Sequence, residues 1–70
     1  MMPLLYASAG EENIIRKVGG SQEIKKHMED LGFVAGGVVT VISEINGNLI
    51  VNVKDSRIAI SREMAGRIFV

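Results

Sequence analysis

The sequence predicts one mainly β domain with a single helix, folded as a small β-barrel of five or six strands. Its length of 70 residues suits one domain, here residues 1–70. Short segments rich in β-branched residues follow one another with tight turns between them, and only one segment has the period of an amphipathic helix. Short strands in so small a chain favour a closed or nearly closed barrel, because closure removes unpaired strand edges.

The composition excludes several classes of protein. Hydrophobic residues make up 47% of the chain and charged residues 23%, a balance too apolar for a disordered protein. There is no cysteine, so a disulfide scaffold, a thiolate zinc site, an iron–sulfur cluster and a cysteine nucleophile are excluded. The formal net charge is zero, whereas proteins that bind nucleic acid usually carry a basic excess.

Two features bear on secretion and membranes. The N-terminal run MMPLLYASAG is apolar but has no basic flank, unlike a secretory signal. The longest uncharged run, Leu31–Ser43, contains three glycines and falls short of the roughly 20 apolar residues that a spanning helix needs. We therefore expect a soluble cytoplasmic protein that does not insert into a membrane.

The first part of the chain is expected to form two strands. Leu4–Ala7 is short and apolar. Asn13–Val18 contains Ile14, Ile15 and Val18, and its β-branched content favours a strand.

The one predicted helix follows Gly19-Gly20-Ser21. Ser21 suits the N-cap, because its hydroxyl can accept from a free backbone N–H of the first turn. Ile24, Met28 and Leu31 have the spacing of one helical face. Gly32 comes next, where a left-handed residue commonly ends a helix.

A β-hairpin is predicted after the helix. Val38–Ile45 and Asn48–Lys54 are the two strands, and Asn46-Gly47 is the preferred dipeptide of a type I′ turn. An unbroken register from this turn puts Ile42 opposite Val51.

The two faces of this hairpin differ in their expected surroundings. Leu49, Val51 and Val53 alternate along the second strand and are expected to face the core. The opposite face is also apolar, and we expect it to be exposed and to contact a partner through Val39, Val41 and Ile50.

The C-terminal part is expected to form two more short strands around one helical turn. Asp55-Ser56 predicts a turn and residues 57–61 a strand. Ser61 suits the N-cap of a helical turn that Gly66 ends, and Ile68–Val70 is expected to be the last strand.

Taken in order along the chain, these residues resemble the FeoA family, small cytoplasmic proteins of the bacterial ferrous iron transport system. The resemblance covers essentially the whole chain, although Ala35 stands where the family usually has proline. It implies an SH3-like β-barrel and a role beside FeoB, the membrane GTPase that carries Fe²⁺. The residues that carry the match are Leu31, Gly32, Phe33, Gly36, Val39, Val41, Ile60, Ser61, Ala65, Ile68 and Val70.

A metal site is one candidate on the predicted helix. Glu23, His27 and Asp30 lie at positions i, i+4 and i+7, and an imidazole with two carboxylates suits Fe²⁺ or Mn²⁺. The alternative is a solvated polar flank with a weak Glu23–His27 pair. The family resemblance implies transition metal binding as well.

Other polar groups have plainer interpretations. Gly19-Gly20-Ser21 is an anion site or, more simply, a turn and cap, since there is no phosphate-binding G-x-x-x-x-G-K-[ST] motif. Arg57 and Arg62 are candidates for an arginine supplied to a GTPase partner, or are simply solvated. A local cluster of basic side chains has two interpretations: it contacts an acidic partner, or it is simply solvated. The cluster consists of Arg16, Lys17, Lys25 and Lys26.

Three functions remain open from the sequence. The first is a non-enzymatic adaptor that contacts a FeoB-type GTPase transporter. The second is a metal sensor or carrier. The third is an SH3-like nucleic-acid module, which the zero net charge and the three aromatic residues disfavour.

Overall fold

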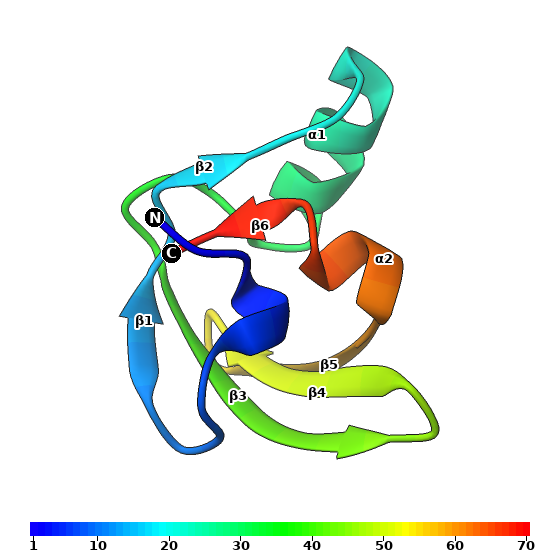
Figure 1. Cartoon of the computed structure of the whole chain (residues 1–70). Coiled ribbons are helices and arrows are strands. Elements are labelled where there is room, and N and C mark those ends of the chain that lie inside the picture. Colours follow the sequence, from blue (N-terminus) through cyan, green and yellow to red (C-terminus); the bar gives the residue numbers. More distant parts are fainter.

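Two antiparallel sheets form the body of the protein in the computed structural model, which describes residues 1–70. One sheet has the strand order β1-β3-β4-β5 and the other pairs β2 with β6 (Figure 1). The prediction of a mainly β fold with five or six strands and one clear helix is confirmed, and the strands number six. In chain order the elements are η1 (Leu4–Tyr6), β1 (Glu12–Ile14), β2 (Lys17–Val18), α1 (Gln22–Asp30), β3 (Val38–Ile45), β4 (Asn48–Val53), β5 (Ser56–Ser61), α2 (Arg62–Ala65) and β6 (Ile68–Phe69).

A single hydrophobic core joins the two sheets and the helical segments. No polar or charged residue is buried in it. The predicted inward face of β4 is confirmed, since its three apolar side chains are at most 2% exposed. The core residues are Leu4, Ile15, Met28, Phe33, Val39, Val41, Leu49, Val51, Val53, Ile60, Ala65 and Ile68.

Helix α1 ends as its sequence predicts. Gly32 has φ +107° and donates its N–H to Glu29 O at 2.9 Å. The N–H of Phe33 reaches back to Met28 O, also at 2.9 Å. These two bonds form a Schellman motif, which satisfies carbonyls at the helix end and sends Phe33 into the core.

The β3–β4 hairpin has the predicted turn but not the predicted register. Asn46 and Gly47 have φ 50° and 83°, as a type I′ turn requires. The ladder then shifts between Val41 and Ser43, so Val51 lies opposite Val41 and the expected Ile42–Val51 pairing is wrong. The reason is a β-bulge: one extra residue in β3 moves every side chain beyond it to the other face.

Because of the bulge, the hairpin also lacks the exposed apolar face that the sequence predicted. Val39 is fully buried and Val41 is 5% exposed, so neither forms the predicted exposed surface. Ile50, opposite Ser43, is half-buried.

Two predicted N-terminal strands are also wrong in part. Leu4–Ala7 is not a strand: Leu4–Tyr6 form a 3₁₀ helix, with the N–H of Ala7 bonded to Leu4 O at 2.9 Å. The run Asn13–Val18 divides between the two sheets because the chain crosses at Ile15, which is buried and donates to Gly37 O at 2.8 Å. Two residues, Ile15 and Arg16, separate β1 from β2, and no glycine or proline in this run marks the change of sheet.

A second tight turn joins β4 to β5 one residue earlier than predicted. Lys54 and Asp55 have φ 48° and 61°, so they are the turn residues, and Ser56 already belongs to β5. Asp tolerates this left-handed region through local side-chain hydrogen bonding. The sequence contained the turn-forming residue but did not show its position in the turn.

The two ends of the chain lie side by side, because the N-terminal residues pair with the C-terminal end of the chain at β6 (Figure 1). Met2 donates its N–H to Val70 O at 3.0 Å, and Val70 donates to Met2 O at 2.9 Å. A bridge between Pro3 and Phe69 extends this pairing. No helix is long and apolar enough to cross a bilayer.

Candidate partner interface

The predicted metal ligands on α1 do not come together. Glu23, His27 and Asp30 are all exposed, and no group of three such side chains is placed to hold a metal ion. The geometry of a helix gives the reason, since positions i and i+7 lie about 10 Å apart along its axis. One ion bound at short metal–ligand distances cannot span that separation without large movements of the side chains.

Some of the other candidate polar residues have local partners. The basic candidates that form no ion pair are Arg16, Lys17, Lys25, Lys26 and Arg57. The hydroxyl of Ser21 accepts from Ile24 N–H at 3.2 Å, and that of Ser61 accepts from Met64 N–H at 3.1 Å, so both predicted N-caps are confirmed. Arg62 pairs with Glu44 at 2.9 Å. These side chains therefore have structural roles.

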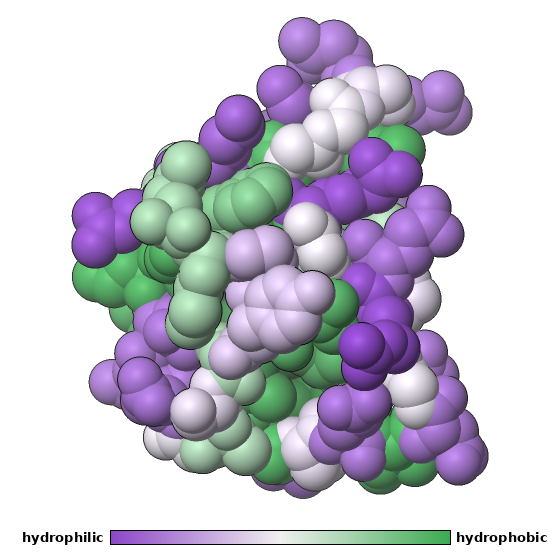
Figure 2. Space-filling model, in the orientation of Figure 1, coloured by the Kyte–Doolittle hydropathy of each residue, from purple (hydrophilic) through white to green (hydrophobic).

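Exposed apolar surface gathers at a place that the sequence did not indicate. Ile14 in β1 lies opposite Val38 in β3, and their side chains are 51% and 47% exposed. Ile14 precedes the buried Ile15, so composition alone could not tell which of the two isoleucines faces outward. Figure 2 shows that hydrophobic atoms also reach the surface near the middle of the face drawn in Figure 1, with hydrophilic side chains around them.

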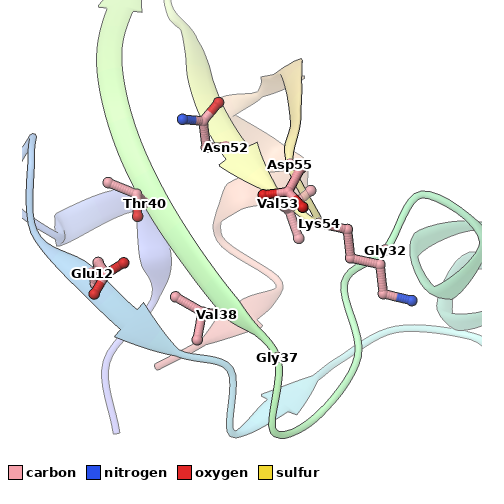
Figure 3. Close-up of a pocket in the computed structure, with 9 residues that line it drawn as sticks. All are labelled: Glu12, Gly32, Gly37, Val38, Thr40, Asn52, Val53, Lys54 and Asp55. Carbon is pink, nitrogen blue, oxygen red and sulfur yellow. The ribbon is translucent and has the colours of Figure 1, made fainter.

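A groove of about 540 Å³ lies beside this apolar pair. Figure 3 shows Glu12 and Thr40 on one side, Lys54 and Asp55 on the other, and Val38 between them. Glu12, Lys54 and Asp55 take part in no ion pair within the protein, so their charges are available to a bound group. The lining residues are Glu12, Gly32, Gly37, Val38, Thr40, Asn52, Val53, Lys54 and Asp55.

Polar side chains continue from this groove across the outer face of the sheet. Glu12 lies opposite Thr40, Thr40 opposite Asn52, and Asn52 opposite Arg57. This row crosses all four strands and ends with Arg57 on the edge strand β5. An apolar pair beside free charges of both signs is suited to a protein surface rather than to a buried small molecule.

A second, smaller hollow lies between α1 and the segment that follows it. Its volume is about 230 Å³, and apolar side chains form most of its wall. Lys25 and Glu29 line its helical side. The apolar residues around it are Val18, Phe33, Val34 and Ala35.

Comparison with known proteins agrees with this barrel over the whole chain. The family model described as the FeoA domain matches residues 2–70. This chain belongs to the FeoA family. A relative from Methanocaldococcus jannaschii, named "Putative Fe(2+) transport protein A", is 36% identical over 70 residues, which are 100% of this chain and 85% of the relative.

Solved FeoA structures share the fold. An iron uptake regulatory protein (FeoA) has a TM-score of 0.87 at 25% identity, over 96% of this chain and 89% of that protein. The zinc complex of FeoA from Stenotrophomonas maltophilia, described as a procaryotic SH3 domain protein, has a TM-score of 0.86 at 24% identity, over 100% and 89%. The predicted SH3-like barrel is therefore confirmed.

The residues that mark this chain as FeoA are chiefly structural. Gly32 ends α1 with a positive φ, and Phe33, Val39 and Ile68 fill the core. Of these four residues, only Gly32 belongs to the lining of the groove. The family pattern therefore specifies the barrel rather than the groove.

Proposed function

We propose that this FeoA protein is a cytoplasmic accessory protein of ferrous iron transport. It acts by binding the cytoplasmic part of a FeoB-type GTPase transporter and has no catalytic activity of its own. The name of the Methanocaldococcus jannaschii relative, which refers to Fe(2+) transport, supports the pathway. A barrel without a membrane-spanning helix acts on ion movement through a partner.

The proposed contact surface rests on one observation, the exposed Ile14–Val38 pair beside the groove. Both side chains are about half exposed, and burying them against a partner would remove apolar area from water. The unpaired charges of Glu12 and Lys54 lie on either side and can set the orientation of the partner. A small and transient interface, below about 1,200 Å², is the expected class.

An NMR titration tests this function. Labelled protein is titrated with the transporter's cytoplasmic domain, with and without a GTP analogue, and separately with Fe²⁺ under anaerobic conditions. We expect the transporter domain to shift the amide signals of Ile14 and Val38 in at least one nucleotide state. Absence of shifts in both states, with Fe²⁺ alone shifting Glu23, His27 and Asp30, would replace the adaptor with a metal carrier.

A pair of matched variants tests the surface. Val38→Ser should weaken binding to the transporter domain, because the substitution removes apolar area from the contact. Ile45→Ser is the control: Ile45 is 55% exposed and lies at the far end of the same strand. Equal weakening by both variants would mean that the contact is elsewhere.

A further inference from the structure

Strand β5 is an open edge of the four-stranded sheet. It pairs with β4 along its full length without a register shift. The first cross-strand pair is Val53 with Ser56, and the last is Asn48 with Ser61. Its other main contact is with α2, which directly follows it. No strand covers its second side.

The direction of the backbone groups follows from the Lys54–Asp55 turn. A two-residue hairpin makes the flanking residues, Val53 and Ser56, a hydrogen-bonded pair, and bonded pairs then alternate along the ladder. Ile58 and Ile60 therefore bond to β4, while the N–H and C=O groups of Arg57 and Ala59 point outward. No backbone hydrogen bond outside the sheets involves Arg57 or Ala59.

The side chains also show that this edge lacks a neighbour. Val41, Val51 and Ile58 form one inward-facing row across the sheet. Val41 is 5% exposed and Val51 is fully buried, but Ile58, last in the row, is only half-buried. Strand β5 contains neither a proline nor a bulge, two of the features by which proteins block edge pairing, and its one charged side chain is Arg57.

We propose that the β5 edge accepts an extended segment of the transporter's cytoplasmic domain as an added strand. The inference rests on the proposed function and specifies how that partner binds. Outward groups of Arg57 and Ala59 supply the main-chain hydrogen bonds. Arg57 is exposed and has no ion pair, so the segment carries an acidic side chain beside it. On the alternate face, an apolar side chain covers Ile58.

Charge complementarity distinguishes this occupant from a second copy of the chain. The sequence of β5 is SRIAIS, which contains one base and no acid. Antiparallel pairing of two β5 strands about Ala59 would put Arg57 opposite Ser61 of the other copy and would leave both guanidinium groups without a carboxylate from β5. A foreign acidic segment satisfies Arg57, and a second β5 strand does not.

Amide hydrogen exchange of the full chain, free and with the transporter's cytoplasmic domain, tests the strand addition residue by residue. In the free protein, the amides of Arg57 and Ala59 should exchange fast, and those of Ile58 and Ile60 slowly. In the complex, exchange at Arg57 and Ala59 should slow by at least about tenfold, since each amide gains a hydrogen bond. The GTP-analogue and nucleotide-free forms of the domain are both used.

Variants give a second, independent measurement. Ala59→Pro removes an outward N–H, a change that edge strands tolerate, and should weaken binding by about tenfold. Arg57→Glu should weaken it as well, more at low salt than at high salt, while Arg57→Lys keeps most of the affinity. Lys26→Glu is the matched control, because it makes the same charge change at an exposed site on α1, outside the four-stranded sheet. If Ala59→Pro does not fold, the exchange data and the Arg57 variants decide.

Three results would overturn the proposal. Binding that leaves the Arg57 and Ala59 amides unprotected rejects strand addition but keeps the proposed function. No binding in either nucleotide state rejects the proposed function and, with it, this partner. Protection in the free protein that grows with its concentration identifies a second copy as the occupant.

Discussion

Val41 lies opposite Val51 across β3 and β4, and the two side chains meet in the core of the barrel. Val51→Ala should lower the free energy of unfolding by about 1.5–3 kcal/mol, since it removes two buried methyl groups and leaves a cavity. Val38→Ala, at a half-exposed position of β3, should cost less than about 1 kcal/mol. Urea unfolding of both variants checks this, and equal losses would contradict the assigned inside face.

The left-handed conformation of Gly32 gives a second prediction. Gly32→Ala should destabilise the protein by about 1 kcal/mol, because φ +107° strains any residue with a Cβ. The added Cβ would also lie 3.3 Å from Lys54 Cδ, a flexible atom that can move away. Gly66→Ala is the control: Gly66 has an ordinary φ of −70°, and its substitution should change stability by less than about 0.5 kcal/mol. An unchanged melting temperature for Gly32→Ala would remove the helix-end argument.

The N-cap of α1 can be tested separately. Ser21→Ala removes the acceptor for Ile24 N–H and should cost about 1 kcal/mol of stability. Ser21→Asp should retain the cap, since its carboxylate accepts the same hydrogen bond and favours the positive end of the helix dipole. Thermal melts of the two variants decide, and a loss with Asp as large as with Ala would mean that the cap has little effect.

The ion pair between Arg62 and Glu44 links α2 to the β3–β4 hairpin but should contribute little. Its side chains are 53% and 54% exposed, so water and salt screen the attraction. A double-mutant cycle with Arg62→Ala and Glu44→Ala should give a coupling of about 0.2–1 kcal/mol that falls at 1 M salt. A larger coupling that salt does not change would indicate a more rigid and better-packed contact than this geometry.

Several parts of the fold could be predicted because their cause is local. The caps at Ser21 and Ser61, the helix end at Gly32 and the turn at Asn46–Gly47 each depend on a few neighbouring residues. Such residue types have few favourable alternatives, so the sequence predicts them correctly. The family resemblance extends these local signals to the SH3-like barrel, since its pattern consists of core and turn residues.

The candidate site was harder to predict, because exposure depends on which face of a strand each side chain occupies. Val39 and Val41 were expected outside and lie inside, while Ile14 and Val38 emerge as the exposed pair. A single extra residue at the bulge reverses the faces of β3, and its sequence contains no glycine or proline to mark the place.

The sequence by itself determined the barrel class, the caps, the turn at Asn46–Gly47 and the inward face of β4. The tertiary structure alone decided the crossing at Ile15, the bulge beside Val41 and the open edge at β5. The physical reason is the range of the interactions. A cap or turn gains its stability within a few residues, whereas register and edges depend on how all the strands fill one small core together.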